Sequence, residues 1–175
     1  MGRVTLHAIT VLGHDRPGII AEATDKLAGL GLNLEDSTMT LLRGHFAMML
    51  VCEGSAADSE IEAALAPLTS DGSLTVTVRE VPTEHVEAAD GTSWVLSVHG
   101  GDRPGIVSAV VGVIAGVGGN ITDLTTRLAG DLYLLVAEVD LPAAADVAAV
   151  ERDLVAVAAD LGVGVTLRAA ETDEL

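Results

Sequence analysis

The same five residues occur twice in this chain, as Asp15-Arg16-Pro17-Gly18-Ile19 and as Asp102-Arg103-Pro104-Gly105-Ile106. The copies lie 87 residues apart (102 − 15), and that offset also relates Gly31-Leu32-Asn33-Leu34-Glu35-Asp36 to Gly118-Gly119-Asn120-Ile121-Thr122-Asp123. It relates Phe46 to Tyr133 as well. Because three separate stretches keep one offset, the sequence predicts an internal duplication of one structural unit.

A helix is predicted after each Pro-Gly pair. Apolar residues recur there at helical spacing, as Ile20, Ala23, Leu27 and Leu30 in the first copy and as Val107, Val110, Ile114 and Val117 in the second. Pro17 and Pro104 suit the first helical position, where the missing N–H loses no hydrogen bond. Glycines end both helices, at Gly29 and Gly31 and at residues 116–119.

The remaining patterns complete a β-α-β-β-α-β order in each copy. Alternating apolar and polar residues predict a first strand, over 4–11 and 94–99. Two more strands joined by a glycine turn follow, over 33–42 and 45–53 and over 120–128 and 131–140. A second helix is predicted over 58–69 and 144–161, and a last strand over 74–81 and 163–169. This order is the ferredoxin-like, split βαβ pattern of an α+β fold, with antiparallel sheets and helices on one face.

The composition excludes several classes of function. Hydrophobic residues make up 49 % of the 175, which is enough apolar material for packed cores. A net charge of −17 disfavours direct nucleic-acid binding and repels anionic membranes. No apolar stretch is long enough to span a bilayer, and the N-terminus does not read as a signal peptide. The single cysteine, Cys52, lies in an apolar run, so we expect a buried thiol in a cytoplasmic protein.

The turn between the first strand and the first helix is the candidate binding site of each copy. The backbone N–H groups of Gly18 and Ile19 have no intrahelical acceptor and lie at the positive end of the helix dipole, which suits a carboxylate. Asp15 beside them is suited to accept from an ammonium group. The arrangement fits an α-amino acid. The equivalent site in the second copy consists of Asp102, Gly105 and Ile106.

Most of these residues also have a purely structural interpretation. An Asp before a Pro-initiated helix can simply satisfy the free N–H groups and the dipole of the helix, and Arg16 and Arg103 then pair with surface acids. Asn33 and Asn120 open a strand where Asn tolerates turn geometry, although their amides also suit a zwitterion. His14 is either an exposed loop residue or a ligand contact. The histidine spacing predicts no metal site, and the sequence contains no catalytic constellation or cofactor motif.

The Asp-Arg-Pro-Gly-Ile turn, followed by Gly-x-Asn at the start of the second strand, resembles the ACT domain. The resemblance covers residues 1–81 and 92–175, with a charged linker over 82–91 and a frayed tail over 171–174. A tandem pair of this size is similar to the glycine cleavage system repressor (GcvR-like) group. The resemblance implies that two ACT domains pair side by side through their second strands into one eight-stranded sheet. It also implies two crossed ligand sites at the interface, one joining Asp15, Gly18 and Ile19 to Asn120 and Ile121, the other joining Asp102, Gly105 and Ile106 to Asn33 and Leu34.

These observations predict a non-catalytic regulatory protein that binds an amino acid and signals to a separate protein. Glycine or serine is suggested by the resemblance alone. Two other functions stay open, a ligand-free interaction module and a small enzyme on a ferredoxin-like scaffold. Exposed sheet edges favour a homodimer. Because Leu32 corresponds to Gly119, one of the two pockets is expected to be tighter.

Overall fold

The computed structural model describes residues 4–83 and 91–171. The chain divides into two compact units, residues 1–85 and 86–175. The predicted linker lies mostly outside the described residues, as does the predicted tail. None of the helices in the described ranges is long and apolar enough to cross a membrane.

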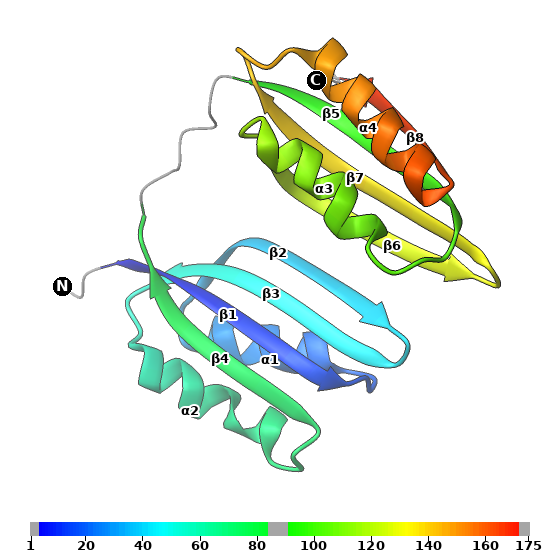
Figure 1. Cartoon of the computed structure of the whole chain (residues 1–175). Coiled ribbons are helices and arrows are strands. Elements are labelled where there is room, and N and C mark those ends of the chain that lie inside the picture. The colour runs from blue at the N-terminus through cyan, green and yellow to red at the C-terminus, as the bar shows by residue number, and fades with distance from the viewer. Residues whose placement is uncertain (1–3, 84–90, 172–175) are drawn as a thin grey trace. The chain divides into compact units, whose positions relative to one another are not determined.

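Unit 1 is a four-stranded antiparallel sheet with two helices on one face (Figure 1). Its elements are β1 (Thr5–His14), α1 (Ile19–Gly29), β2 (Asn33–Leu42), β3 (His45–Gly54), α2 (Asp58–Thr69) and β4 (Leu74–Val81). The strand order is β2-β3-β1-β4. Arg43 (φ 50°) and Gly44 (φ 83°) form the tight β2–β3 turn with positive φ, as hairpins with two-residue loops require.

Unit 2 repeats this architecture. Its elements are β5 (Gly91–Gly101), α3 (Ile106–Gly116), β6 (Asn120–Ala129), β7 (Leu132–Pro142), α4 (Val147–Leu161) and β8 (Val163–Ala169), in the strand order β6-β7-β5-β8. The predicted ferredoxin-like βαββαβ fold is therefore confirmed in both copies. The second helix starts three residues later than predicted. Asp146 stays extended and caps it, accepting from the Ala149 N–H at 3.2 Å.

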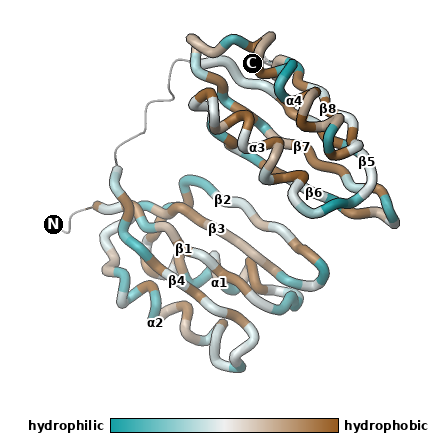
Figure 2. Tube along the Cα trace, in the orientation of Figure 1, coloured by the Kyte–Doolittle hydropathy of each residue, from teal (hydrophilic) through white to brown (hydrophobic). Residues whose placement is uncertain are grey.

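Each unit has its own apolar core between sheet and helices, and Figure 2 shows hydrophobic segments in both. The predicted buried face of α1 is wrong by one position at its start. Ile19, Ala23 and Leu27 are buried, whereas Ile20 is 43 % exposed. In α3 the buried residues are likewise Ile106, Val110 and Ile114. The spacing is still helical, but it runs i, i+4, i+8 from the isoleucine directly after the glycine.

One core leucine comes from different elements in the two units, from the end of the first helix in unit 1 and from a strand in unit 2. After α1, Leu32 N–H donates to Leu27 O (3.1 Å) in a Schellman arrangement, and the Leu32 side chain enters the core. Space for it exists because Gly54 lies opposite: a Cβ there would come within 2.4 Å of Leu32 Cδ2. In unit 2 the pair is reversed, with Gly119 at the helix end and buried Leu141 on the strand. The expected tighter pocket is therefore not supported, because Leu32 packs in the core.

Strands β2 and β6 each contain a bulge near their start. The pairing register shifts between Leu34 and Asp36, and likewise between Ile121 and Asp123. One extra residue, Glu35 in β2, is left without a partner opposite it. Leu34 and Asp36 consequently point to opposite faces of the sheet although they are two residues apart.

Candidate functional site

The Pro-Gly pair forms a turn that precedes each helix. Gly18 has φ 90° and ψ −2°, and Gly105 has φ 91° and ψ −1°. These values match the third residue of a type II turn, which favours glycine, and proline is common just before it. The helix then begins at the following isoleucine. The predicted placement of Pro17 and Pro104 at the first helical position is wrong, because the turn keeps both prolines outside the helix.

Backbone donors are available at the start of α1 and α3. The first helical hydrogen bond of α1 runs from Glu22 N–H to Gly18 O (2.9 Å), so the N–H groups of the preceding turn lack intrahelical acceptors. Among the described residues, no side chain caps either helix. Asp15 and Asp102 therefore do not serve as caps, although the structural interpretation assigned them that role. The Ile19 and Ile106 side chains are buried, so these residues offer only their backbone to a ligand.

The loop before each helix is attached to the neighbouring hairpin. Asp15 N–H donates to Gly44 O at 3.1 Å in unit 1, and Asp102 N–H donates to Asp131 O at 3.4 Å in unit 2. Both aspartate residues are exposed. Each carboxylate is therefore held beside the helix start by its own backbone, and its side chain is left facing solvent.

The arginine of the motif is used differently in the two units. In unit 1, Arg16 Nη2 pairs with Glu22 Oε2 at 3.1 Å, and both side chains are 34 % exposed. In unit 2 the position of Glu22 is taken by Ala109, and within the described ranges Arg103 forms no ion pair. The predicted pairing with a surface acid thus holds for Arg16 and is not seen for Arg103.

Unit 2 has a cavity of about 480 Å³ at this helix start. Three of its lining residues, Asp102, Gly105 and Ile106, were predicted from the sequence. The others are Arg103, Val107, Ser108 and Tyr133. Ser108 and Tyr133 were missed as site residues, although their hydroxyl groups replace the apolar side chains that unit 1 has at these positions, Ala21 and Phe46. The difference between Phe46 and Tyr133 was the available signal.

The asparagine half of the predicted site lies elsewhere in each unit. Asn33 pairs with Glu53 at one end of β3, whereas Asp15 binds the turn at the other end. Eight residues of strand, about 26 Å, separate them. Asn33 Nδ2 donates to Glu35 in the bulge. Asn120 and Asp102 of unit 2 are separated in the same way, so neither unit brings its own aspartate and asparagine together. The joining of Asn120 and Ile121 or of Asn33 and Leu34 to the opposite turn stays a prediction.

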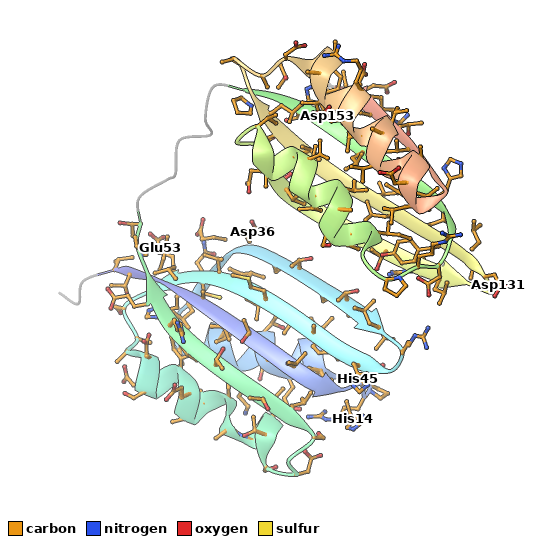
Figure 3. All side chains as sticks on the ribbon, viewed as in Figure 1. His14, Asp36, His45, Glu53, Asp131 and Asp153 are labelled. Carbon is orange, nitrogen blue, oxygen red and sulfur yellow. The ribbon has the colours of Figure 1, made fainter. Side chains whose placement is uncertain are left out.

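The three histidines of unit 1 that the structure describes fall into two environments. His14 and His45 are paired at the open end of β1 and β3, with ring centroids 5.5 Å apart, and Figure 3 shows them side by side. His14 is the last residue of β1 and exposed, as one of the two interpretations held. His7 is buried: its Nδ1 lies 2.7 Å from Asp58 Oδ1, and its Nε2 lies 2.9 Å from Thr5 Oγ1. This polar pair connects β1 to the start of α2, so its role is structural.

Cys52 is buried in the core of unit 1, as predicted. Burial, and to a lesser extent the negative charge of Glu35, raises the pKa of its thiol. A thiol held in its neutral form is a poor nucleophile. No group of three or more His, Cys, Asp or Glu side chains within the described ranges is arranged to hold a metal ion.

Comparison with known proteins identifies the family. Residues 6–79 and 93–168 each match the family model described as the ACT domain. The chain belongs to the ACT-domain family. Membership supports a regulatory, ligand-binding role and places the chain in a family of regulatory modules, not of enzymes.

Two of the following relatives extend over both units, and a shorter one matches a stretch no longer than one unit. The chain is 27 % identical over 161 residues to the glycine cleavage system transcriptional repressor of Escherichia coli (strain K12), covering 87 % of this chain and 84 % of that protein. It is 38 % identical over 64 residues to the UPF0237 protein lin0537 of Listeria innocua, covering 37 % and 72 %. A crystal structure of an unknown protein from Galdieria sulphuraria superposes with a TM-score of 0.79 at 29 % identity, covering 97 % and 100 %.

Proposed function

We propose that this tandem ACT protein binds a free amino acid at its Pro-Gly turns and transmits the occupancy to a separate protein. The cavity at the start of α3 carries the proposal. It combines a carboxylate on Asp102, a guanidinium on Arg103 and a hydroxyl on Tyr133 with the free N–H groups of the helix start. Such a set offers acceptors to an ammonium group and donors to a carboxylate.

Under this proposal the two turns are not equivalent. The turn of unit 1 keeps its aspartate, but its Arg16 is paired with Glu22, and the position of Tyr133 is taken by Phe46, which is buried in the core. The turn of unit 2 is therefore the tighter binding site for a zwitterion. Completion of each site by the asparagine end of the other ACT domain, in a side-by-side pair, is part of the same proposal.

The output is proposed to pass to a protein partner in the cytoplasm. The net charge of −17 opposes a direct contact with nucleic acid, so transcriptional control of the kind named for the Escherichia coli relative would be indirect here. Glycine and serine are the first ligands to test because of that relative's name. A homodimer is the proposed assembly.

The test is a thermal-shift and calorimetric screen of the purified full chain against the twenty amino acids. A ligand at 100 times its Kd adds about 2.7 kcal/mol of stability, which raises Tm measurably. We expect one ligand class to stabilise the wild type, and Asp102→Asn to abolish the effect. Tyr133→Phe should weaken binding, because it copies the residue of unit 1.

Two variants serve as controls. Asp153→Asn changes an exposed aspartate on α4, away from the cavity residues, and should bind like the wild type. Asp15→Asn should bind more nearly like the wild type than Asp102→Asn does. If no amino acid shifts Tm in a folded sample, the proposal is wrong and the ligand-free interaction module becomes the better description. Turnover of an added amino acid would instead support the small-enzyme alternative.

A further inference from the structure

The sheet of unit 1 has one face that no helix of the unit covers. Side chains alternate along each strand, and the buried positions of β1 and β3 all point to the helix side. The middle of the opposite side, between a row that contains Glu53 and a row that contains His14 and His45, is called the open face. It consists of three rows that run across β2, β3, β1 and β4 through paired residues. The rows are Thr40-Ala47-Leu12-Thr75, Thr38-Met49-Thr10-Thr77 and Asp36-Val51-Ala8-Arg79.

The open face differs in charge from the rest of this acidic chain. The chain has 26 acidic residues, yet the first two rows contain none, and the third has one acid and one base, both on edge strands. Its apolar side chains are accessible: Leu12 is 57 % exposed and Met49 is 46 % exposed. A groove of about 400 Å³ runs between them. The two uncharged rows therefore combine accessible apolar side chains with threonines, and an exposed patch of apolar side chains can mark an interaction site.

We infer that the open face of unit 1 binds the open face of a second copy of this chain. The proposed twofold axis lies parallel to the strands, along the boundary between β3 and β1. With this axis, β3 of one copy lies over β1 of the other, and each row lies over its own counterpart. Two sheets packed in this way have nearly aligned strands, the common arrangement of β-sandwiches.

The side chains of the two central strands are self-complementary about that axis. Each row has one large and one small residue on β3 and β1: Ala47 beside Leu12, Met49 beside Thr10, and Val51 beside Ala8. Rotation about the axis places each large side chain over the small one of the other copy. Alternation of large and small residues across facing positions is what lets two layers interdigitate.

The edge charges are complementary about the same axis. Asp36 on β2 and Arg79 on β4 end one row on opposite edges of the sheet, each one strand away from the central pair. The rotation brings Asp36 of each copy over Arg79 of the other, which gives two symmetric ion pairs at the rim. A second copy fits this pattern better than an unrelated partner does, because the same patch supplies both halves of every contact.

The area of the open face determines how strongly two copies are expected to associate. Four strands at about 4.8 Å and three rows at about 6.8 Å give a projected area on the order of 400 Å² per copy. That area is at the low end of specific interfaces, and the charge of −17 on each copy opposes association elsewhere. The dimer is therefore weak, with a dissociation constant in the micromolar range, and it is stabilised by salt that screens the net charge.

The test is sedimentation velocity of the full chain from about 1 to about 200 μM, a range that spans micromolar association. The wild type should shift from monomer to dimer. Leu12→Asp and Met49→Asp should weaken the association at least tenfold. Val155→Asp is the matched control, because Val155 on α4 is also exposed, at 59 %, and its substitution should leave the dimer intact.

A charge exchange keeps the test decisive if an apolar variant fails to fold. Asp36→Arg alone and Arg79→Asp alone should each weaken the dimer, because like charges then face each other, and the double variant should restore it. A chain that stays monomeric over the whole range overturns the inference. So does a dimer whose affinity is unchanged by Leu12→Asp or by either single charge variant, since that dimer uses another surface, such as the β2 edge.

Discussion

The leucine and glycine that face each other in each core stand at opposite positions in the two units, and this difference leads to a quantitative prediction. Unit 1 has Leu32 at the helix end and Gly54 on the strand, whereas unit 2 has Gly119 and Leu141 at the equivalent positions. We therefore predict that Leu32→Gly and Gly54→Leu are each destabilising alone and largely compensate each other together.

The expected magnitudes follow from the packing. Leu32 is 8 % exposed, and removal of such a buried leucine side chain costs about 2–5 kcal/mol. Gly54→Leu keeps Leu32 in place and forces a side chain into occupied space, since a Cβ there would lie 2.4 Å from Leu32 Cδ2. Overpacking of this kind costs about 1–3 kcal/mol. The double variant should lose less than about 2 kcal/mol, so the coupling energy should exceed about 1 kcal/mol.

Native-state hydrogen exchange can measure this within the intact chain. Core amides of β1 and β3 report the opening free energy of unit 1, and those of β5 and β7 serve as an internal control that should not change. If the losses of opening free energy in the two single variants simply add in the double variant, the reasoning is refuted, because the side chains at positions 32 and 54 would then not occupy the same space in the core.

Three further predictions concern single residues. Native Cys52 should react with a disulfide reagent more slowly, and at higher pH, than in the urea-unfolded chain, because burial and then Glu35 raise its pKa; equal rates in both states would contradict this. Ala57→Ser should raise Tm by supplying the missing side-chain cap of α2, worth about 0.5–1 kcal/mol, and an unchanged Tm would argue against it. Asp58→Ala should lower the exchange-derived stability of unit 1 by about 1–3 kcal/mol, because buried His7 loses its partner; a loss near zero would mean that water replaces the carboxylate.

Local sequence signals were sufficient for the order and most boundaries of the elements. Strand β2 runs from Asn33 to Leu42 as predicted, because a Schellman glycine precedes it and the Arg43-Gly44 turn follows it. The phase of α1 was predicted incorrectly, since Pro17 was placed in the helix instead of in the preceding turn. One residue of error at the start moves the expected buried position from Ile19 to Ile20.

The candidate site was less predictable because it depends on contacts between distant segments. The motif identified Asp102 and Gly105, which belong to a single loop. Tyr133 reaches the same cavity from β7, and only the folded sheet brings the two together. The ion pair between Arg16 and Glu22 was likewise not predictable from the motif, because it depends on side-chain geometry in the folded unit.

The bulge at Glu35 determines which side chains of β2 face the helices and which face the open side of the sheet. If β2 paired regularly through Glu35, with no bulge, every position from 36 to 42 would turn over. Asp36, Thr38 and Thr40 would then point toward the helix layer, and the thioether of Met39 would lie on the outer surface. Deletion of the single codon for Glu35 would avoid this change, because Leu34 and Asp36 would become neighbours in a regular strand and would keep the opposite faces that they have now. Because β6 has the same irregularity between Ile121 and Asp123, loss of the residue between them should likewise leave both faces of the second sheet unchanged.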